Sequence, residues 1–144
     1  MKAHNIGKRI YLDANIYIYA FELVESFQES VTQLFQQIES DNLEVFASDL
    51  ILTEILPKPI RDERKDIAEK YLQYLQHSPS IHLVRVSQEV IEASVRLRAK
   101  YNLRSMDALH LATAITHQCE SFITNDHKLE KVSEIRVRLL DGNS

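Results

Sequence analysis

The chain has 144 residues and a formal net charge of −4, with 44% hydrophobic and 26% charged residues. These values are typical of one globular domain with a buried core, and they exclude a collagen-like, fibrous or disordered chain. Two glycines and three prolines are too few for the many tight turns of a β-sandwich. We therefore expect a helix-rich single domain over residues 1–144.

The sequence shows no pattern of export or membrane insertion. The single cysteine, Cys119, excludes an internal disulfide and a cysteine-based zinc cluster, and its apolar neighbours indicate a packed core thiol. Residues 1–9 are polar, and the longest apolar run, residues 16–21, is too short to cross a bilayer. We therefore expect a cytoplasmic protein that does not contact a membrane.

Short apolar segments alternate with stretches of helical periodicity along the chain. Runs rich in β-branched and aromatic residues predict strands, whereas apolar residues that recur every three or four positions predict amphipathic helices. The expected elements, in chain order, are a strand at 9–12, helices at 15–21 and 26–40, a strand at 43–47, helices at 50–56 and 62–76, a strand at 81–86, helices at 88–100 and 105–117, and strands at 121–124 and 136–139.

Polar residues and prolines predict several helix ends. Ser48 or Asp49 can cap the helix at 50–56, and Ser87 can cap the helix that follows it. Pro57 and Pro59 are expected to end the helix at 50–56.

The order of the elements predicts the architecture. Strands that alternate with helices of this length pair in parallel through right-handed crossovers. We expect an α/β fold, a three-layer α/β/α sandwich with a mostly parallel central sheet of about four to five strands. In such sheets ligands bind outside the carboxyl ends of the strands.

Four acidic residues stand at positions that suit a shared site. Asp13 directly follows the first strand, and Asp126 follows the strand at 121–124, so both are expected at the same edge of the sheet. Glu54 and Asp107 lie in helices whose other residues are mostly apolar. A carboxylate among apolar side chains is costly to bury unless it is paired or binds a metal.

Each of these acids also has a purely structural interpretation. Asp13 and Asp126 can cap the helices that follow them, and Asp107 suits the positive end of a helix dipole. Glu54 can point to solvent from a helix that packs on one side only. Each alternative accounts for one residue, whereas a common site accounts for all four placements.

Four segments together resemble the motifs of PIN domains. They are LDANI (residues 12–16), SDLILTEI (48–55), SMDALHLATA (105–114) and FITND (122–126). The motifs occur in the family's order and span almost the whole chain, and the third and fourth are the most specific. The resemblance implies a nuclease in which Asp13, Glu54, Asp107 and Asp126 bind metal and carry catalysis, supported by hydrogen bonds from Asn15 and Thr124.

The expected metal follows from the donor atoms. Carboxylate oxygens without thiolate or imidazole suit Mg²⁺ or Mn²⁺, and such ions activate water for hydrolysis of a phosphodiester. Glu54 is expected to be either a ligand or the group that orients the attacking water. One residue departs from the family pattern: Ala14 stands where a small hydroxyl residue is usual, which predicts less precise positioning of an acid or water but no lost ligand.

Contacts to substrate are expected from residues beside the acids. Arg104 precedes the Asp107 helix and is placed to reach a phosphate, and His127 is expected to be exposed next to Asp126. The other basic residues, at 58–65 and 96–100, are better explained as solvated helix faces. His110 lies one helical turn after Asp107, where a packed histidine is favoured over a metal ligand.

The resemblance extends to VapC-like toxins of bacterial toxin–antitoxin pairs. It implies an RNA substrate, a small antitoxin protein as partner, and a homodimer. Two alternatives stay open at this point. One is a catalytically weak PIN module that binds nucleic acid or protein without cleavage. The other is a Mg²⁺-dependent phosphatase, although Asn15 occupies the position where such an enzyme needs a second aspartate, and no glycine-rich phosphate loop is present.

Overall fold

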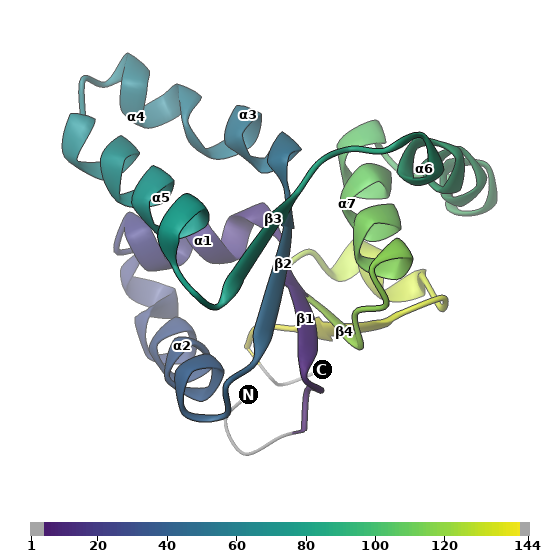
Figure 1. The fold of residues 1–144 in the computed structure, drawn as a ribbon, viewed down its shortest axis with the longest axis horizontal. Helices are drawn as coiled ribbons and strands as arrows, with labels where there is room; N and C mark the ends of the chain where they lie inside the picture. Colours follow the sequence, from purple (N-terminus) through teal and green to yellow (C-terminus); the bar gives the residue numbers. More distant parts are fainter. Residues whose placement is uncertain (1–4, 142–144) are drawn as a thin grey trace.

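The structure is a computed structural model that describes residues 5–141. Within these residues a parallel five-stranded sheet forms the centre of the molecule, in the order β3-β2-β1-β4-β5 (Figure 1). The strands are β1 (Arg9–Leu12), β2 (Glu44–Ser48), β3 (Ile81–Val84), β4 (Ser121–Thr124) and β5 (Arg136–Leu139). The predicted parallel sheet is confirmed, and β1, which carries the first acidic motif, lies in its middle between β2 and β4.

Helices cover both faces of the sheet, as predicted for a three-layer sandwich (Figure 1). The helices on one face are α1 (Ala14–Phe21), α2 (Gln28–Ser40) and α5 (Lys65–His77). The other face carries α6 (Gln88–Tyr101) and α7 (Ser105–Thr116), which pack against each other. Short 3₁₀ turns complete the chain at Glu25–Phe27, Asp49–Ile51 and His127–Lys131.

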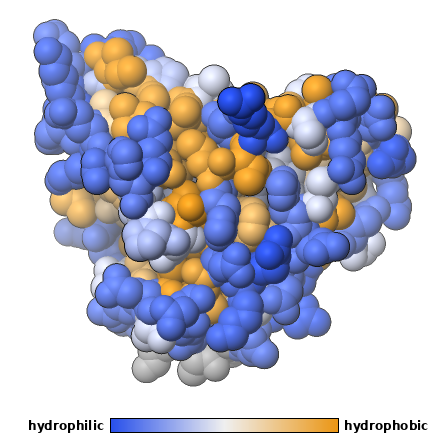
Figure 2. All heavy atoms as spheres, viewed as in Figure 1, coloured by the Kyte–Doolittle hydropathy of each residue, from blue (hydrophilic) through white to orange (hydrophobic). Residues whose placement is uncertain are grey.

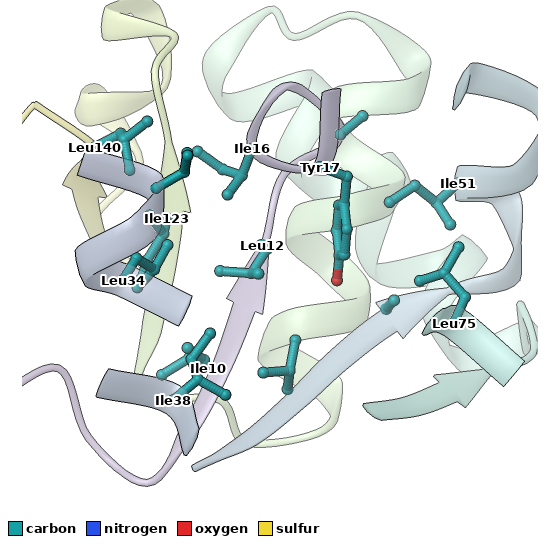
Figure 3. Packing of buried hydrophobic residues seen from close by; sticks show 14 of the residues in the cluster. Ile10, Leu12, Ile16, Tyr17, Leu34, Ile38, Ile51, Leu75, Ile123 and Leu140 are labelled. Atoms are coloured by element: carbon teal, nitrogen blue, oxygen red, sulfur yellow. The ribbon is translucent and has the colours of Figure 1, made fainter. Parts of the chain in front are cut away.

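The two hydrophobic cores follow from the alternation of side chains along β1. Ile10 and Leu12 point to the face covered by α1, α2 and α5, where Ile16, Tyr17 and other apolar residues bury them completely (Figure 3). Tyr11 points to the opposite face, toward α7. Because residues i and i+2 of a strand share a face, β1 serves both cores at once.

The segment after β2 differs from the prediction. Residues 49–51 form a 3₁₀ turn, α3 covers Leu52–Ile55, and a further helix, α4, begins at Pro57 and runs to Arg61. The predicted end of the helix before Pro57 is therefore confirmed, whereas the second helix, which begins at Pro57, was not predicted. The first turn of a helix has N–H groups without intrahelical partners, so a proline there loses no hydrogen bond and starts a new helix.

Smaller deviations concern boundaries and exposure. The predicted strand at 81–86 ends at Val84, and the predicted helix at 62–76 begins at Lys65. Cys119 is buried, as predicted.

Figure 2 shows apolar side chains gathered on the visible face over α3 and α5. No helix within residues 5–141 has the length and apolar character that a membrane crossing requires.

Candidate active site

The four predicted carboxylates line one open pocket of about 250 Å³. Its walls are Asp13, Ala14, Asn15, Ile18, Glu54, Arg104, Asp107 and Asp126. Asp13 and Asp126 follow the carboxyl ends of β1 and β4, which are neighbours in the sheet. Glu54 comes from α3 and Asp107 from the first turn of α7. The site therefore lies at the edge of the sheet where parallel α/β folds bind ligands.

Asp13 is both a helix cap and a buried member of the pocket. Its Oδ1 accepts a hydrogen bond from the backbone N–H of Ala14 at 2.8 Å, and its Oδ2 accepts one from the hydroxyl of Thr124 at 2.7 Å. Burial raises the pKa of Asp13 above its ordinary value, while the bond from Thr124 acts in the opposite direction. The capping interpretation and the site interpretation thus describe the same side chain.

Thr124 connects the two acids that follow neighbouring strands. Its hydroxyl, fully buried, donates to Asp13 and accepts hydrogen bonds from the backbone N–H of Asp126 at 3.0 Å and from Nδ2 of Asn15 at 3.4 Å. Asp126 also caps the following 3₁₀ turn, where its Oδ1 accepts from the N–H of Lys128 at 3.0 Å. Both residues predicted to support the acids, Asn15 and Thr124, belong to this one network.

Asp107 is paired with the arginine one turn before it. The guanidinium of Arg104 donates from Nε to Oδ2 at 2.9 Å and from Nη2 to Oδ1 at 3.2 Å, a bidentate ion pair. Asp107 is nearly buried, whereas the side chain of Arg104 is 76% exposed. The hydrogen bonds to Asp107 raise the pKa of Arg104. The arginine thus neutralises one pocket acid from the solvent side.

Glu54 is held from behind by residues of the α7 layer. Its Oε1 contacts Nε2 of His110, whose ring is completely buried, and Nδ1 of His110 contacts the hydroxyl of Tyr11 on β1. The preference for a packed His110 on α7 therefore agrees with the structure. Tyr11 was not a candidate in the sequence, because a strand tyrosine flanked by isoleucine and leucine is indistinguishable from an ordinary core residue.

Comparison with known proteins assigns the fold. The model of the PIN domain family matches residues 10–135. The chain belongs to the PIN domain family. No protein with a curated description matches the sequence.

Several solved structures share the fold of this PIN domain. A chain of VapBC2 from Rickettsia felis, bound to a DNA fragment from their promoter, superposes with a TM-score of 0.71 at 15% identity, covering 91% of this chain and 98% of that chain. A toxin–antitoxin complex from Klebsiella pneumoniae gives a TM-score of 0.64 at 24% identity, with 88% and 98% covered. FitAcB from Neisseria gonorrhoeae gives 0.68 at 16% identity, with 89% and 95% covered.

The donor set of the PIN pocket suits a hard divalent cation. All four acids that line it offer oxygen atoms, which Mg²⁺ and Mn²⁺ prefer. Within residues 5–141, however, no three acidic, histidine or cysteine side chains approach closely enough to form a ready-made metal site. Asp107 is instead paired with Arg104. The oxygen atoms of these side chains fit such a metal ion. To bind it, Asp107 would have to release Arg104.

The remaining predicted contacts divide between the pocket and the surface. Arg104 lines the pocket, whereas His127 is exposed beside it, with its Nδ1 3.8 Å from a carboxylate oxygen of Glu130. The basic residues of α4 and its flanks pair with nearby acids, as in the Lys58–Asp62 and Arg64–Asp66 bridges. These pairs agree with the interpretation of a solvated helix face.

Proposed function

We propose that this PIN domain is a divalent-metal-dependent endoribonuclease, the toxin of a type II toxin–antitoxin pair. The observation that carries the proposal is the meeting of Asp13, Glu54, Asp107 and Asp126 around one pocket at the carboxyl edge of the sheet. These acids come from two strand ends and two helices, and the first and last of them are 113 residues apart in sequence. Membership of a family whose proteins are generally nucleases supports this assignment.

In this proposal the four carboxylates hold one or two Mg²⁺ or Mn²⁺ ions. A bound divalent ion supplies an activated water nucleophile and neutralises charge on the phosphate and the departing oxygen. Asp13, Asp107 and Asp126 serve as direct ligands, and Glu54 is either a ligand or the group that orients the attacking water. Thr124 and Asn15 keep the acids at the two strand ends in register, since one hydroxyl bonds to both of them.

Arg104 has a second role in the proposed reaction. In the structure it pairs with Asp107, and its exposed side chain is free to turn outward once a cation takes its place. The same guanidinium then offers two parallel donors to a phosphate oxygen pair of the RNA. His127, exposed beside Asp126, is the other proposed substrate contact.

The alanine at position 14 does not weaken this assignment. Ala14 contributes to the hold on Asp13 through its backbone N–H, which any non-proline residue supplies. A hydroxyl at this position would add a donor near the pocket, and its absence removes neither a ligand nor the bond at Oδ1.

A small antitoxin protein and a second copy of the chain are the proposed partners. The support for an antitoxin is the shared fold with chains from toxin–antitoxin complexes. Large apolar side chains that are exposed on the domain, Leu23, Ile60, Ile91 and Val95, offer surface for such contacts. Light scattering of the purified chain, with and without the product of a small neighbouring reading frame, tests both partners.

The deciding experiment is cleavage of a pool of single-stranded and structured RNAs in Mg²⁺, in Mn²⁺ and in EDTA. Asp107→Asn is expected to lower the rate more than about 100-fold, because loss of a ligand exceeds the usual cost of losing a group behind it. Asp62→Asn, at an exposed carboxylate of the surface ion pairs, is the matched control and should cleave like the wild type.

Metal-dependent cutting that Asp107→Asn alone abolishes would establish both the activity and the site. A folded wild type that binds Mn²⁺ and cuts no RNA would favour the binding module instead. Release of phosphate from small monoesters would favour the phosphatase.

A further inference from the structure

A chain of buried polar groups lies behind Glu54, on the side away from the pocket. Nε2 of His110 contacts Oε1 of Glu54, Nδ1 of His110 contacts the hydroxyl of Tyr11, and that hydroxyl accepts a hydrogen bond from the backbone N–H of Ser48 at 3.0 Å. His110 and Tyr11 have no exposed surface. Polar groups this deep in an apolar layer are expensive to bury unless each has a partner, and here each has one.

The direction of every hydrogen bond in this chain follows from Ser48. A backbone N–H only donates, so the hydroxyl of Tyr11 accepts there and needs an acceptor for its own proton. Among the described residues, the atom placed to receive that proton is Nδ1 of His110. Nδ1 therefore carries the lone pair, and Nε2 carries the proton that is donated to Glu54.

The opposite tautomer leaves the network incomplete. With a proton on Nδ1, the Tyr11 oxygen would face two donors, and its own proton would have no acceptor within residues 5–141. A lone pair on Nε2 would then face the Glu54 carboxylate directly. The arrangement that gives Ser48, Tyr11, His110 and Glu54 each a partner uses both ring nitrogens of His110. Because neither nitrogen is then free to bind a metal, the ring supports the Glu54 carboxylate from behind.

The same tyrosine fixes both ends of the segment that carries Glu54. It bonds directly to Ser48, where the 3₁₀ turn begins, and through His110 it reaches Glu54 on α3. Tyr11 also stands two residues before Asp13 on β1. The position of Glu54 is thereby set relative to the strand that presents another acid of the pocket.

We propose that His110, oriented by Tyr11, is a positioning residue that holds the Glu54 carboxylate ready for the divalent cation. This inference rests on the proposed function, because it gives Glu54 a part in metal binding. Groups that orient the ligands of a metal in this way affect its affinity about 10- to 100-fold when they are removed.

The test compares Mn²⁺ binding, measured by calorimetry on the full chain, among matched variants. His110→Leu removes both bonds, and His110→Gln retains an N–H donor and a carbonyl acceptor. Tyr11→Phe removes only the hydroxyl that orients the ring. Tyr17→Phe is the control, because Tyr17 is an equally buried tyrosine whose hydroxyl has no hydrogen-bond partner in the described part of the chain.

We expect His110→Leu and Tyr11→Phe to weaken Mn²⁺ binding about 10-fold or more, with partial recovery in His110→Gln and no change in Tyr17→Phe. Nitrogen-15 NMR of the wild type without metal should show the proton of His110 on Nε2. If His110→Leu misfolds, Tyr11→Phe carries the comparison, since it leaves the ring in place.

Two results separate the failure of this inference from that of the proposed function. Wild-type Mn²⁺ affinity in Tyr11→Phe, or a proton on Nδ1, would overturn the positioning role while leaving the nuclease intact. A wild type that binds no Mn²⁺ would overturn the proposed function, and the positioning role with it.

Discussion

Asp13 and Asp107 face the same pocket, but the fold holds them in opposite ways. Asp13 is bonded by a buried hydroxyl and a backbone amide, neither of which can leave without disrupting the sheet or α1. Asp107 is bonded by an arginine that is 76% exposed and that can swing into solvent. One acid is thus fixed when the chain folds, whereas the other is held by an exposed partner that, in the proposed function, a metal ion displaces. The contrast divides the pocket into a preformed half and an adjustable half.

The largest effect is expected where the preformed half is disrupted. Thr124→Val removes the buried donor to Asp13 and leaves a carboxylate oxygen without its partner, which should lower the free energy of unfolding by about 1–3 kcal/mol. Urea denaturation measures this change. Thr113→Val is the control, because the buried hydroxyl of Thr113 bonds to the Leu109 carbonyl of its own helix. If both variants lose the same free energy of unfolding, the hydrogen bond to Asp13 stabilises the fold no more than the bond within α7 does.

A smaller effect is expected in the adjustable half. Arg104→Ala removes the cation that competes for Asp107, so Mn²⁺ should bind about two- to fivefold more tightly, as expected for an exposed ion pair. RNA should bind more weakly, because the proposed phosphate contact is lost. Calorimetry with Mn²⁺ and filter binding of RNA report the two effects separately. Arg96→Ala, at an exposed position of α6, serves as the control. Weaker Mn²⁺ binding in Arg104→Ala would mean that the arginine supports the metal site instead of competing for it.

The smallest effect concerns the protonation of Asp13. Burial raises the pKa of Asp13 in the folded chain, so the native state binds a proton more readily than the unfolded state does. In EDTA, the stability that Asp13 contributes should therefore fall as the pH rises from the ordinary value of 3.8 through the raised pKa. The hydrogen bond from Thr124 acts against this rise in the pKa.

Denaturation of the wild type and Asp13→Asn across this pH range isolates the contribution of Asp13. The stability of the wild type relative to the variant should decrease with rising pH. A relative stability that instead increases with pH would show that the fold favours the charged form of Asp13.

The sequence predicts most of the scaffold and the membership of the pocket. The strands at 9–12, 121–124 and 136–139 have the predicted bounds. The path after Ser48 is not predictable to the same degree. Pro57 predicts the end of the helix before it, but whether a new helix starts there depends on the direction of the chain in three dimensions, which local propensity does not contain.

The partners of the acids are the part that sequence patterns cannot supply. The contact between Tyr11 and His110 joins residues 99 positions apart, and it exists only because β1 and α7 pack together. The bidentate form of the Arg104–Asp107 pair is local, at a separation of three, yet its strength depends on how exposed the arginine becomes in the folded chain. The periodicity of apolar residues predicts which side chains are buried, but it does not predict which polar atoms form hydrogen bonds with each other.

The position of β4 in the sheet has a consequence for the growing polypeptide. β4 pairs directly with β1, and Thr124 at its end is the donor that fixes Asp13, 111 residues earlier in the chain. During synthesis the first acids therefore emerge long before the strand that organises them. Contacts of such long sequence separation form late in folding. The pocket is consequently assembled only after β4 has been synthesised, and a product that stops before Ser121 carries the earlier acids without the strand that arranges them.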